Sequence, residues 1–322
     1  MKAQTVLVTG AGGYVGQLLV RALAHRGGAG PKVVATDIRL PAPGRRLPGV
    51  IYEVLDVTQP GTASLLKAHN VDAVVHLAAI VTPKKGDAEA LLHKVDVEGT
   101  RHMLEGCVQA GVRHFTVTSS GAAYGYHADN PVPLSEDDAL RGNRSFPYAH
   151  HKKLVEQMLD EYREQHPELK QLVLRPGTIL GRSTKNQITA LFEKPWVMGL
   201  NDSETPFVII WDEDVVGAIL WGLEHARAGI FNLAGDGTLS LREMAKMMNK
   251  PFVPMPSKAV ERALGLLNPM GLSQYGPEQV DFLRYRPVLD NRRLKEDFGY
   301  VPKKTSRQAF ELYLGRRGEN QT

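Results

Sequence analysis

The stretch TVLVTGAGGYVGQLLVRAL, residues 5–23, reads as a buried strand, a glycine-rich turn and an amphipathic helix in direct succession. Its glycines Gly10, Gly13 and Gly16 are evenly spaced. The first permits a sharp turn, the second lets the main chain approach a pyrophosphate, and the third lets the helix lie close to the strand. The helix then points its free N–H groups and its positive dipole end at the phosphates. This order of elements predicts a dinucleotide-binding unit.

The first half of the chain continues this alternation of strand and helix. Because continuous apolar strands separated by helices are typical of a parallel sheet buried on both faces, we predict a doubly wound α/β Rossmann fold. In the expected helix at 147–165, the apolar residues form one stripe. The expected strands are Thr5–Val8, Val33–Thr36, Ala73–Leu77, Phe115–Thr118 and Leu172–Leu174, and the other expected helices are Tyr14–Arg26 and about 88–110.

The character of the sequence changes after Arg175, where loops rich in proline and glycine begin. Two further short strands are expected at Phe207–Ile210 and Gly229–Asn232. We therefore assign residues 1–175 to the dinucleotide-binding domain, with strands returning at about 206–238. Residues 176–205 and 239–322 are expected to form a smaller C-terminal substrate-binding lobe.

Composition limits the classes of function. The chain has 322 residues, a net charge of +4 and dispersed basic pairs, which argue against a nucleic-acid surface. The single cysteine, Cys107, allows no internal disulfide and is expected in the core, so we expect a reducing, cytoplasmic location. We expect no signal peptide, because the first apolar run is short and glycines follow at once. We also expect no membrane span, because no apolar run approaches about 20 residues.

One acidic residue, Asp37, bears on the choice between NAD and NADP, and a second, Asp56, is expected near the adenine. The second strand ends in VVATDIR, which places Asp37 where a carboxylate can bind the ribose hydroxyls of NAD and would repel the 2′-phosphate of NADP. Arg39 is the alternative signal, since an arginine there could hold that phosphate. We favour NAD over NADP. Asp56 and Val57, after the third strand, are expected near the adenine.

Seven motifs, in this order and at this spacing, resemble the extended short-chain dehydrogenases/reductases, the NAD-dependent epimerase/dehydratase superfamily. They are TGAGGYVG at 9–16, DV at 56–57, HLAA at 76–79, DVEGT at 96–100, TSSGAAYG at 118–125, YAHHK at 148–152 and RPGTILG at 175–181. The segment LDNRRLKEDFGYVP at 289–302 is similar to the closing helix and turn of that family. The resemblance covers almost the whole chain.

The resemblance implies the roles of particular residues. Ser120, Tyr148 and Lys152 match the catalytic serine, tyrosine and lysine, and Ser119 matches the neighbouring non-catalytic serine. One departure is Asp96, which stands where the family usually has asparagine. The cofactor contacts implied by the fold and the family are Gly10, Gly13, Tyr14, Val15, Gly16, Asp37, Ile38, Asp56, Val57, Leu77, Ala78, Ala79, Thr118, Tyr148, Lys152, Pro176 and Thr178.

The implied chemistry explains why Tyr148 and Lys152 stand one helical turn apart. Hydride transfer at a carbon bearing oxygen requires a proton to leave or reach that oxygen. A free tyrosine has a pKa of about 10, which is too high for a base at neutral pH. A lysine ammonium four residues away and the positive nicotinamide ring are expected to favour the phenolate. The hydroxyl of Ser120 would stabilise charge on the substrate oxygen.

The motifs leave more than one reaction open. A 4,6-dehydratase needs an acid and a base after the catalytic serine, where this chain has Gly121 and Ala122. A nucleotide-sugar epimerase needs anchors for a diphosphate, and the two usual positions hold Thr178 and Phe207. Other cations that could substitute are Arg182, Lys185 and Arg242. We therefore favour an NAD(H)-dependent oxidoreductase that interconverts a secondary alcohol and a ketone, with a UDP-hexose 4-epimerase as the alternative.

Further features of the sequence bear on function and assembly. A catalytically silent NAD(H) sensor is disfavoured because Ser120, Tyr148 and Lys152 are all present. His76 is expected to be a core histidine, and the adjacent His150 and His151 do not predict a metal site because neighbouring helix residues point apart. By resemblance, the helices at about 88–110 and 147–165 predict a homodimer. An apolar substrate pocket or core is expected from Trp196, Met198, Trp211, Phe252 and Met255.

Overall fold

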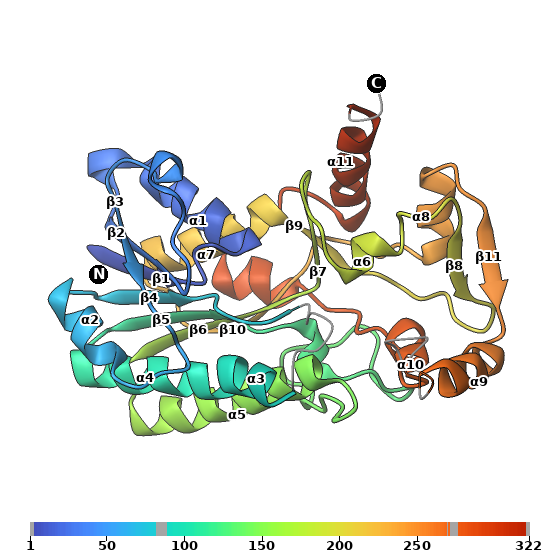
Figure 1. Cartoon of the computed structure of the whole chain (residues 1–322), viewed down its shortest axis with the longest axis horizontal. Coiled ribbons are helices and arrows are strands. Elements are labelled where there is room, and N and C mark those ends of the chain that lie inside the picture. The colour runs from blue at the N-terminus through green and yellow to red at the C-terminus, as the bar shows by residue number, and fades with distance from the viewer. Residues whose placement is uncertain (1–2, 82–88, 269, 271–275, 320–322) are drawn as a thin grey trace.

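The computed structural model describes residues 3–81, 89–268, 270 and 276–319. Its centre is a parallel sheet with strand order β10-β6-β5-β4-β1-β2-β3 (Figure 1). Every neighbouring pair in this sheet is parallel, as a doubly wound α/β fold requires. The strands are β1 Thr5–Thr9, β2 Lys32–Asp37, β3 Val50–Val54, β4 Ala73–His76, β5 His114–Thr118, β6 Lys170–Pro176 and β10 Gly229–Leu233.

Helices cover both faces of this sheet and bury a separate core on each (Figure 1). Helices α1 (Tyr14–Ala24) and α7 (Asp212–His225) pack on one face. The other face is covered by α2 (Thr62–Ala68), α4 (Gly99–Ala110) and α5 (Pro147–Gln165). Because the sheet is apolar on both sides, its strands are continuous apolar runs, as the sequence predicted.

The order of strands determines where a ligand can bind. β1 lies between β2 and β4, so the chain leaves β1 toward one side of the sheet and later returns on the other. Such a reversal opens a crevice at the carboxyl ends of the strands. The segments that follow β1, β4, β5 and β6 all meet at this edge, and they carry the motifs at 9–16, 76–79, 118–125 and 175–181.

A smaller lobe lies beside that edge (Figure 1). Two parallel strand pairs belong to it, β7 (Thr178–Leu180) with β9 (Ile209–Trp211) and β8 (Val197–Leu200) with β11 (Phe252–Met255). Its core joins residues from these strands with residues from several helices. The helices of this part are α6 Gln187–Ala190, α8 Leu241–Met247, α9 Ser257–Leu267, α10 Gln279–Arg284 and α11 Ser306–Glu319.

Two predicted elements differ from the structure. The strand expected at Phe207–Ile210 begins at Ile209 and pairs with β7 outside the central sheet, while Phe207 forms an isolated bridge with Leu239. The helix expected at about 88–110 is not uniform: α3 (Glu89–His93) and α4 are separated by a π-helical turn at Lys94–Glu98. The extra residue in that turn aims the buried side chain of Asp96 at the main chain of Ile80. Residue 88 lies outside the described part.

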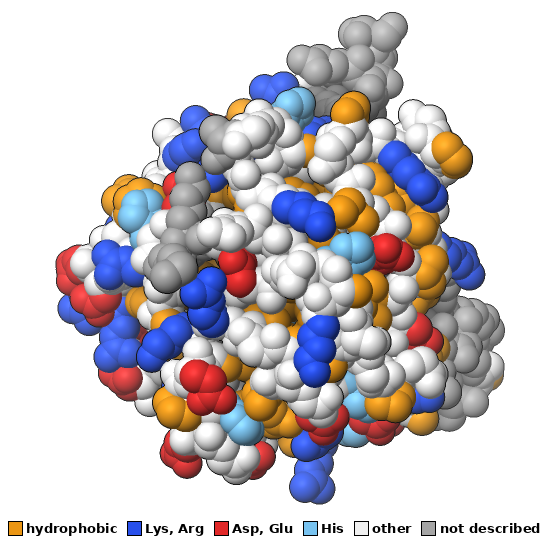
Figure 2. Space-filling view, turned by 90° about the vertical axis from the view of Figure 1, so that its left-hand side faces the viewer, with side chains coloured by type: hydrophobic (Ala, Val, Ile, Leu, Met, Phe, Trp, Pro, Cys, Tyr) orange, Lys and Arg blue, Asp and Glu red, His pale blue; other side chains and the backbone are white. Residues whose placement is uncertain are grey.

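Other expectations about the core and surface are met. Cys107 is fully buried, and burial raises the pKa of its thiol. His76 is also buried, with its ring nitrogens 2.8 Å from Thr9 Oγ1 and 3.2 Å from Thr100 Oγ1. Acidic and basic side chains are interspersed on the face shown in Figure 2. Within the described ranges, none of the helices has the length and apolar character needed to cross a bilayer.

Candidate active site

The glycine turn has the geometry that its sequence predicts. Gly10 adopts a positive φ of 62°, and a Cβ there would lie 2.8 Å from the main-chain nitrogen of Ala78. A Cβ on Gly16 would lie 2.1 Å from the carbonyl oxygen of Gly10, so only glycine lets α1 approach the turn this closely. The N-terminus of α1 has no side-chain cap. Its first N–H groups and its dipole therefore fit a bound pyrophosphate.

Tyr14 connects this turn to the smaller lobe. Its hydroxyl donates a hydrogen bond to Asp212 at the start of α7 and accepts one from Thr184 Oγ1 at 2.9 Å. Thr184 Oγ1 also accepts a hydrogen bond from the main chain of Gly181, 2.7 Å away. Burial, followed by the hydrogen bond to Asp212, raises the pKa of Tyr14 to about 12, so this tyrosine is a neutral structural contact.

The acidic residue after β2 lies beside the turn. Asp37 Oδ2 accepts a hydrogen bond from the main chain of Gly12 at 2.9 Å, while Ile38 is exposed. Asp56, after β3, is held by the main chain and hydroxyl of Thr58, and this hydrogen bonding lowers its pKa. These carboxylates lie along the path that an adenosine would take from the turn across β2 and β3.

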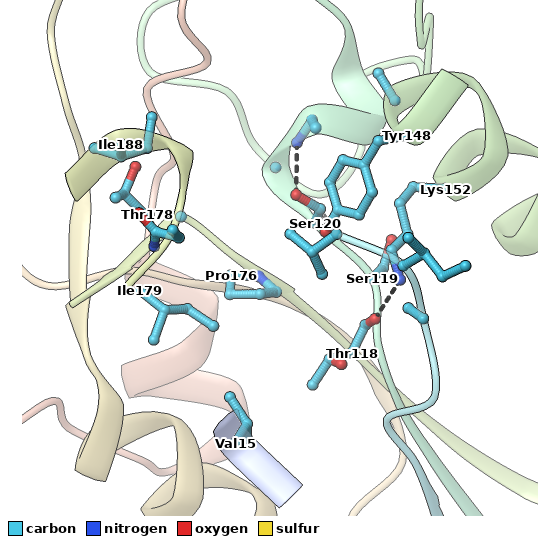
Figure 3. A pocket seen from close by; sticks show the side chains of 18 of the residues that line it. Val15, Thr118, Ser119, Ser120, Tyr148, Lys152, Pro176, Thr178, Ile179 and Ile188 are labelled. Carbon is cyan, nitrogen blue, oxygen red and sulfur yellow. Dashed lines mark hydrogen bonds between the residues drawn. The ribbon is translucent and has the colours of Figure 1, made fainter. Parts of the chain in front are cut away.

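One cavity of about 550 Å³ joins the glycine turn to the Ser–Tyr–Lys group. It lies between the carboxyl edge of the sheet and the smaller lobe (Figure 3). Most predicted site residues line it: Gly10, Gly13, Tyr14, Val15, Gly16, Leu77, Ala79, Thr118, Ser120, Tyr148, Lys152, Pro176 and Thr178. Asp37, Ile38, Asp56, Val57 and Ala78 are not part of its lining.

Ser120, Tyr148 and Lys152 face this cavity from two adjacent elements (Figure 3). Ser120 follows β5 and its Oγ accepts a hydrogen bond from the main chain of Ala122 at 3.1 Å. Tyr148 and Lys152 lie one turn apart near the start of α5, with Lys152 Nζ 5.6 Å from the centroid of the Tyr148 ring. Lys152 Nζ donates a hydrogen bond to the carbonyl oxygen of Thr118 at 2.9 Å, which fixes the ammonium at the end of β5.

The structure adds an effect of burial on Tyr148 that the sequence prediction did not include. Burial raises its pKa to about 12, the hydrogen bond with Ser120 lowers it, and the charge of Asp96 raises it. Burial also lowers the pKa of Lys152. The lysine therefore does not make the phenol acidic by itself in the cofactor-free protein. An additional positive charge in the cavity is needed to bring the phenol toward neutral pH.

A buried ionic network supports this wall of the cavity. Arg175 at the end of β6 binds Glu156 on α5 through two parallel hydrogen bonds, Nε to Oε1 at 3.0 Å and Nη2 to Oε2 at 2.7 Å. Ser119 donates a hydrogen bond to the same carboxylate. Arg175 Nη1 also donates to the hydroxyl of Tyr124 at 2.7 Å. The network ties α5, which carries Tyr148 and Lys152, to the Ser119–Ser120 segment.

The structure adds one site residue that sequence reasoning missed. Arg286, just after α10, lines the cavity with its guanidinium between the rings of Phe207 and Phe282, at 4.0 Å and 4.6 Å from their centroids. Its Nη2 donates to Thr178 Oγ1 at 3.1 Å, and its buried Nη1 has no partner among the described residues. Burial lowers its pKa to about 10, so it stays positive at pH 7. Its sequence context, YRP in a loop-rich segment, carried no signal of this role.

The apolar residues of the smaller lobe that are predicted to form a substrate pocket or a core do not line the cavity. Trp196, Met198, Trp211, Phe252 and Met255 are absent from the cavity lining. Trp196 and Met198 are exposed, and Trp211 and Phe252 pack against the core of the smaller lobe. Of the cations considered as substitutes, Lys185 lines the cavity, whereas Arg242 lies over the ring of Phe252. The apolar lining comes instead from Ile80, Leu92, Tyr126, Phe146, Ile188, Val208, Phe282 and Leu289.

Relatives of this chain include both enzymes and proteins of no stated activity. An uncharacterized protein of Mycobacterium tuberculosis is 26% identical over 318 residues, 98% of this chain and 84% of the relative. A UDP-glucose 4-epimerase of Erwinia amylovora is 31% identical over 57% of this chain and 56% of the relative. A 3-beta-hydroxysteroid dehydrogenase of Mycolicibacterium neoaurum is 28% identical over 58% of this chain and 51% of the relative.

The fold itself recurs in solved structures. A short-chain dehydrogenase/reductase superfamily protein from Agrobacterium tumefaciens, crystallised with bound NAD, superposes with a TM-score of 0.74. The two sequences are 23% identical, and the superposition covers 98% of each chain. The model of the NAD dependent epimerase/dehydratase family matches residues 6–234, which include the glycine turn and the Ser–Tyr–Lys group. The chain therefore belongs to the NAD dependent epimerase/dehydratase family, whose cofactor is NAD.

Proposed function

We propose that the protein is an NAD(H)-dependent oxidoreductase that interconverts a secondary alcohol and a ketone. The observation that carries this proposal is the convergence of Ser120, Tyr148 and Lys152 on a largely apolar cavity that is continuous with the glycine turn. Gly10, Gly13 and Gly16 would hold the phosphates of a bound dinucleotide, and the same cavity would bring its nicotinamide end toward the three side chains. When bound, NAD supplies the hydride chemistry.

The protein's own residues then move the proton and hold the substrate. In the direction of ketone reduction, the neutral phenol of Tyr148 donates its proton to the oxygen that becomes the alcohol, and in oxidation the phenolate accepts it back. The Ser120 hydroxyl donates a hydrogen bond to the same oxygen and stabilises its developing negative charge. Lys152, fixed by Thr118, places a positive charge near the tyrosine ring. The apolar lining excludes water from these groups.

The residues that line the cavity also argue against the elimination reaction that a dehydratase catalyses. Asp96 is the sole carboxylate among the described residues that line the cavity, and both of its oxygens have partners within the protein. A dehydratase would need a further acid and base beside Ser120, where Gly121 and Ala122 stand. The cavity therefore supports hydride transfer without elimination.

A second candidate, a UDP-hexose 4-epimerase, is favoured by one specific observation. The guanidinium of Arg286 carries a buried positive charge, and its Nη1 lacks a partner among the described residues. An unpaired buried charge is costly, and an anionic group on the substrate would offset that cost. Arg286 contacts Thr178 and Phe207, the two positions where diphosphate anchors were expected and are missing. The relationship to the Erwinia epimerase is consistent with this candidate.

A two-part experiment separates the candidates. The first part measures the NADH absorbance band while a panel of secondary alcohols, ketones and UDP-sugars is added. Net formation or loss of NADH with an alcohol–ketone pair supports the oxidoreductase. The second part measures NAD retained after extensive dialysis and follows UDP-glucose by NMR. Stoichiometric retained NAD with inversion at C4, and no net NADH change, would replace the oxidoreductase with the epimerase.

A further inference from the structure

The substrate side of the cavity contains a positive charge that no group in the described part of the chain neutralises. Arg286 lies between the rings of Phe207 and Phe282, and its Nη2 donates a hydrogen bond to Thr178 Oγ1 at 3.1 Å. Its Nη1 is buried and has no hydrogen-bond partner among the described residues. Because an arginine stays protonated at neutral pH, the guanidinium keeps its full charge in this position.

The neighbouring arginine shows how such a charge is compensated elsewhere in the protein. Arg284, at the end of α10, pairs with the carboxylates of Asp202 and Glu261. Arg286 has no carboxylate partner among the described residues, and its guanidinium contacts the faces of two aromatic rings instead. A buried charge without its counterion is unfavourable. The free Nη1 of Arg286 therefore fits an anionic group that a ligand supplies.

A second free donor lies beside Arg286. Tyr126 lines the cavity, and its ring packs against that of Phe282 with the centroids 5.1 Å apart. The hydrogen bonds of Tyr126 within the described part of the chain run through its main chain to Asn143, which leaves its hydroxyl available. Burial raises the pKa of Tyr126 to about 12, while Arg286 lowers it and Tyr148 raises it, as expected for a phenol near both. This neutral hydroxyl can donate to the same anion as the guanidinium.

These donors lie apart from the groups that are proposed to react. Thr178, the hydrogen-bond partner of Arg286, lies across the cavity from Ser120 (Figure 3). Tyr126 packs in one cluster with Tyr148 and so continues the wall from the reacting end toward Arg286. A substrate whose oxygen lies at Ser120 and Tyr148 would therefore direct the rest of its chain toward Arg286.

The size and charge of the cavity favour a small acid over a second nucleotide. The volume of about 550 Å³ would be shared between the nicotinamide end of the cofactor and the substrate. Lys185 also lines the cavity, but it is exposed to solvent and needs no anion to offset its charge. A diphosphate brings two negative charges, whereas Arg286 offers one free nitrogen among apolar side chains. A carboxylate, with one charge and two acceptor oxygens, matches the donors of Arg286 and Tyr126.

We propose that Arg286 and Tyr126 form a carboxylate-binding site, so that the protein acts on a hydroxy acid or oxo acid whose carboxylate is separated from the reacting carbon. Oxidation of such a hydroxy acid by NAD gives the oxo acid, NADH and a proton, and the carboxylate is unchanged. The choice of an alcohol or a ketone rests on the proposed oxidoreductase function. The carboxylate site does not, because binding can be measured without hydride transfer.

The first measurement is the binding of 4-oxopentanoate and 5-oxohexanoate to the full-length protein with NAD, by isothermal titration calorimetry. Oxidised NAD has no hydride to give, so the ketones bind without turnover. The matched ligands are the neutral amides of the same acids, which keep the chain and lose the charge. We expect each acid to bind at least about tenfold more tightly than its amide, because the acid accepts a charge-assisted hydrogen bond. Equal affinities, or no binding of either acid, overturn the proposal.

The second measurement repeats these titrations with variants. Arg286→Gln keeps a donor for Thr178 and removes the charge, so we expect the preference for acid over amide to disappear. Tyr126→Phe removes one neutral donor, so we expect the acid affinity to fall by about 2- to 10-fold. The matched control is Arg242→Gln, which removes an arginine stacked on Phe252 outside the cavity lining and is expected to keep the preference. A preference that persists in Arg286→Gln contradicts the proposal.

A titration with UDP tests the competing ligand. Binding of UDP that is lost in Arg286→Gln, together with no binding of the acids, would assign Arg286 to a nucleotide diphosphate and overturn the carboxylate site. If Arg286→Gln does not fold, Arg286→Met takes its place, because an apolar side chain suits the space between two phenylalanine rings.

The proposed function and the carboxylate site fail in different ways. Tyr148→Phe is expected to keep the preference for acid over amide, because it leaves Arg286 and Tyr126 in place, and loss of the preference in this variant would contradict the assignment. If the wild type binds the acids through Arg286 but no hydroxy acid or oxo acid changes the NADH absorbance, the oxidoreductase function fails and the carboxylate site stands.

Discussion

At the scale of the residue, the proposed chemistry of this site depends on the environment of a single phenol, that of Tyr148. Tyr148 lies in an apolar wall where burial raises its pKa to about 12, and Lys152 is itself destabilised as a cation by the same burial. The hydrogen bond with Ser120 lowers the tyrosine pKa, but by less than burial raises it. A positively charged nicotinamide ring in the cavity would add the missing attraction for the phenolate. We therefore expect Tyr148 to become acidic only when NAD is bound.

Removal of this hydroxyl gives the first prediction. Tyr148→Phe keeps the ring and its packing but removes the proton donor, so we expect kcat to fall by about 10²–10⁴-fold. NAD affinity, measured by isothermal titration calorimetry, is expected to change little. The matched control is Tyr162→Phe on the same helix, because Tyr162 is half-buried and lies outside the cavity lining. Equal activity of Tyr148→Phe and the control would contradict the proposed role.

The direction of the tyrosine shift gives the second prediction. The pKa of Tyr148 is raised, so the phenol is protonated at neutral pH and ready to donate a proton. Oxidation needs the phenolate, so its rate is expected to rise with pH from 7 to 9 at saturating NAD. Reduction needs the phenol, so its rate is expected to be level or to fall over the same range. Stopped-flow traces of NADH in both directions test this, and an oxidation rate that falls with rising pH would contradict it.

At the scale of the element, α5 carries Tyr148 and Lys152, the proposed catalytic pair, and a buried ion pair one turn further along the helix holds it in place. Glu156 and Arg175 are 2% and 4% exposed and bind through two hydrogen bonds, with Ser119 on the same carboxylate. This arrangement fixes α5 against the ends of β5 and β6. Thr118 ends β5, Ser120 follows it, and both line the cavity. The positions of the site residues therefore depend on the Glu156–Arg175 ion pair, which does not line the cavity.

Neutralising this pair gives the third prediction. Glu156→Gln keeps the shape of the side chain but leaves the Arg175 charge buried without its counterion, which costs about 3–5 kcal/mol. The free energy of unfolding from urea titration should fall by that amount. The matched control is Asp160→Asn on the same helix, because Asp160 pairs with Arg163 at the surface. An exposed pair contributes about 0–1 kcal/mol, so similar losses in both variants would contradict the argument.

At the scale of the whole molecule, the cavity belongs to neither lobe alone. The sheet contributes the glycine turn, the segment after β4 and the Ser–Tyr–Lys group, while the smaller lobe contributes Arg286, Lys185 and Ile188. The hydrogen bonds of Tyr14 to Asp212 and from Thr184 join the cofactor turn to the loop after β7. A ligand bound in the cavity would therefore contact both the central sheet and the smaller lobe.

The oligomeric state is the fourth prediction, and it rests on the family resemblance. Helices α4 and α5 lie side by side over one face of the sheet, with partly buried Val108, Leu154 and Tyr162 among their side chains (Figure 1). We expect these helices to pair across a two-fold axis. Light scattering on the eluted protein is expected to give about twice the chain mass of 35.4 kDa. The mass of a single chain would refute the dimer.

The sequence by itself determined the sheet, the glycine turn and the one-turn spacing of Tyr148 and Lys152, while the family resemblance placed Ser120 with them. These features follow from local patterns: apolar runs bury strands, Gly10 and Gly16 meet steric demands within the turn, and Tyr148 and Lys152 share a helix face because of helical periodicity. Local pattern and fold agree because each of these elements is stabilised by contacts near in sequence or along one sheet.

Only the tertiary structure decided which residues line the substrate side of the cavity and which charged groups lie near it. Arg286 lies 108 residues from Thr178 and His151 lies 55 from Asp96, and no periodicity links either pair. The π-helical turn that aims Asp96 at Ile80 is likewise invisible in the apolar pattern of the helix. The effect of burial on the pKa of Tyr148 could not be predicted from the sequence, because desolvation depends on every atom packed around the phenol. These features depend on contacts between segments that are far apart in the sequence. A sequence pattern does not reveal them, because it reports only on residues that are close together in the chain.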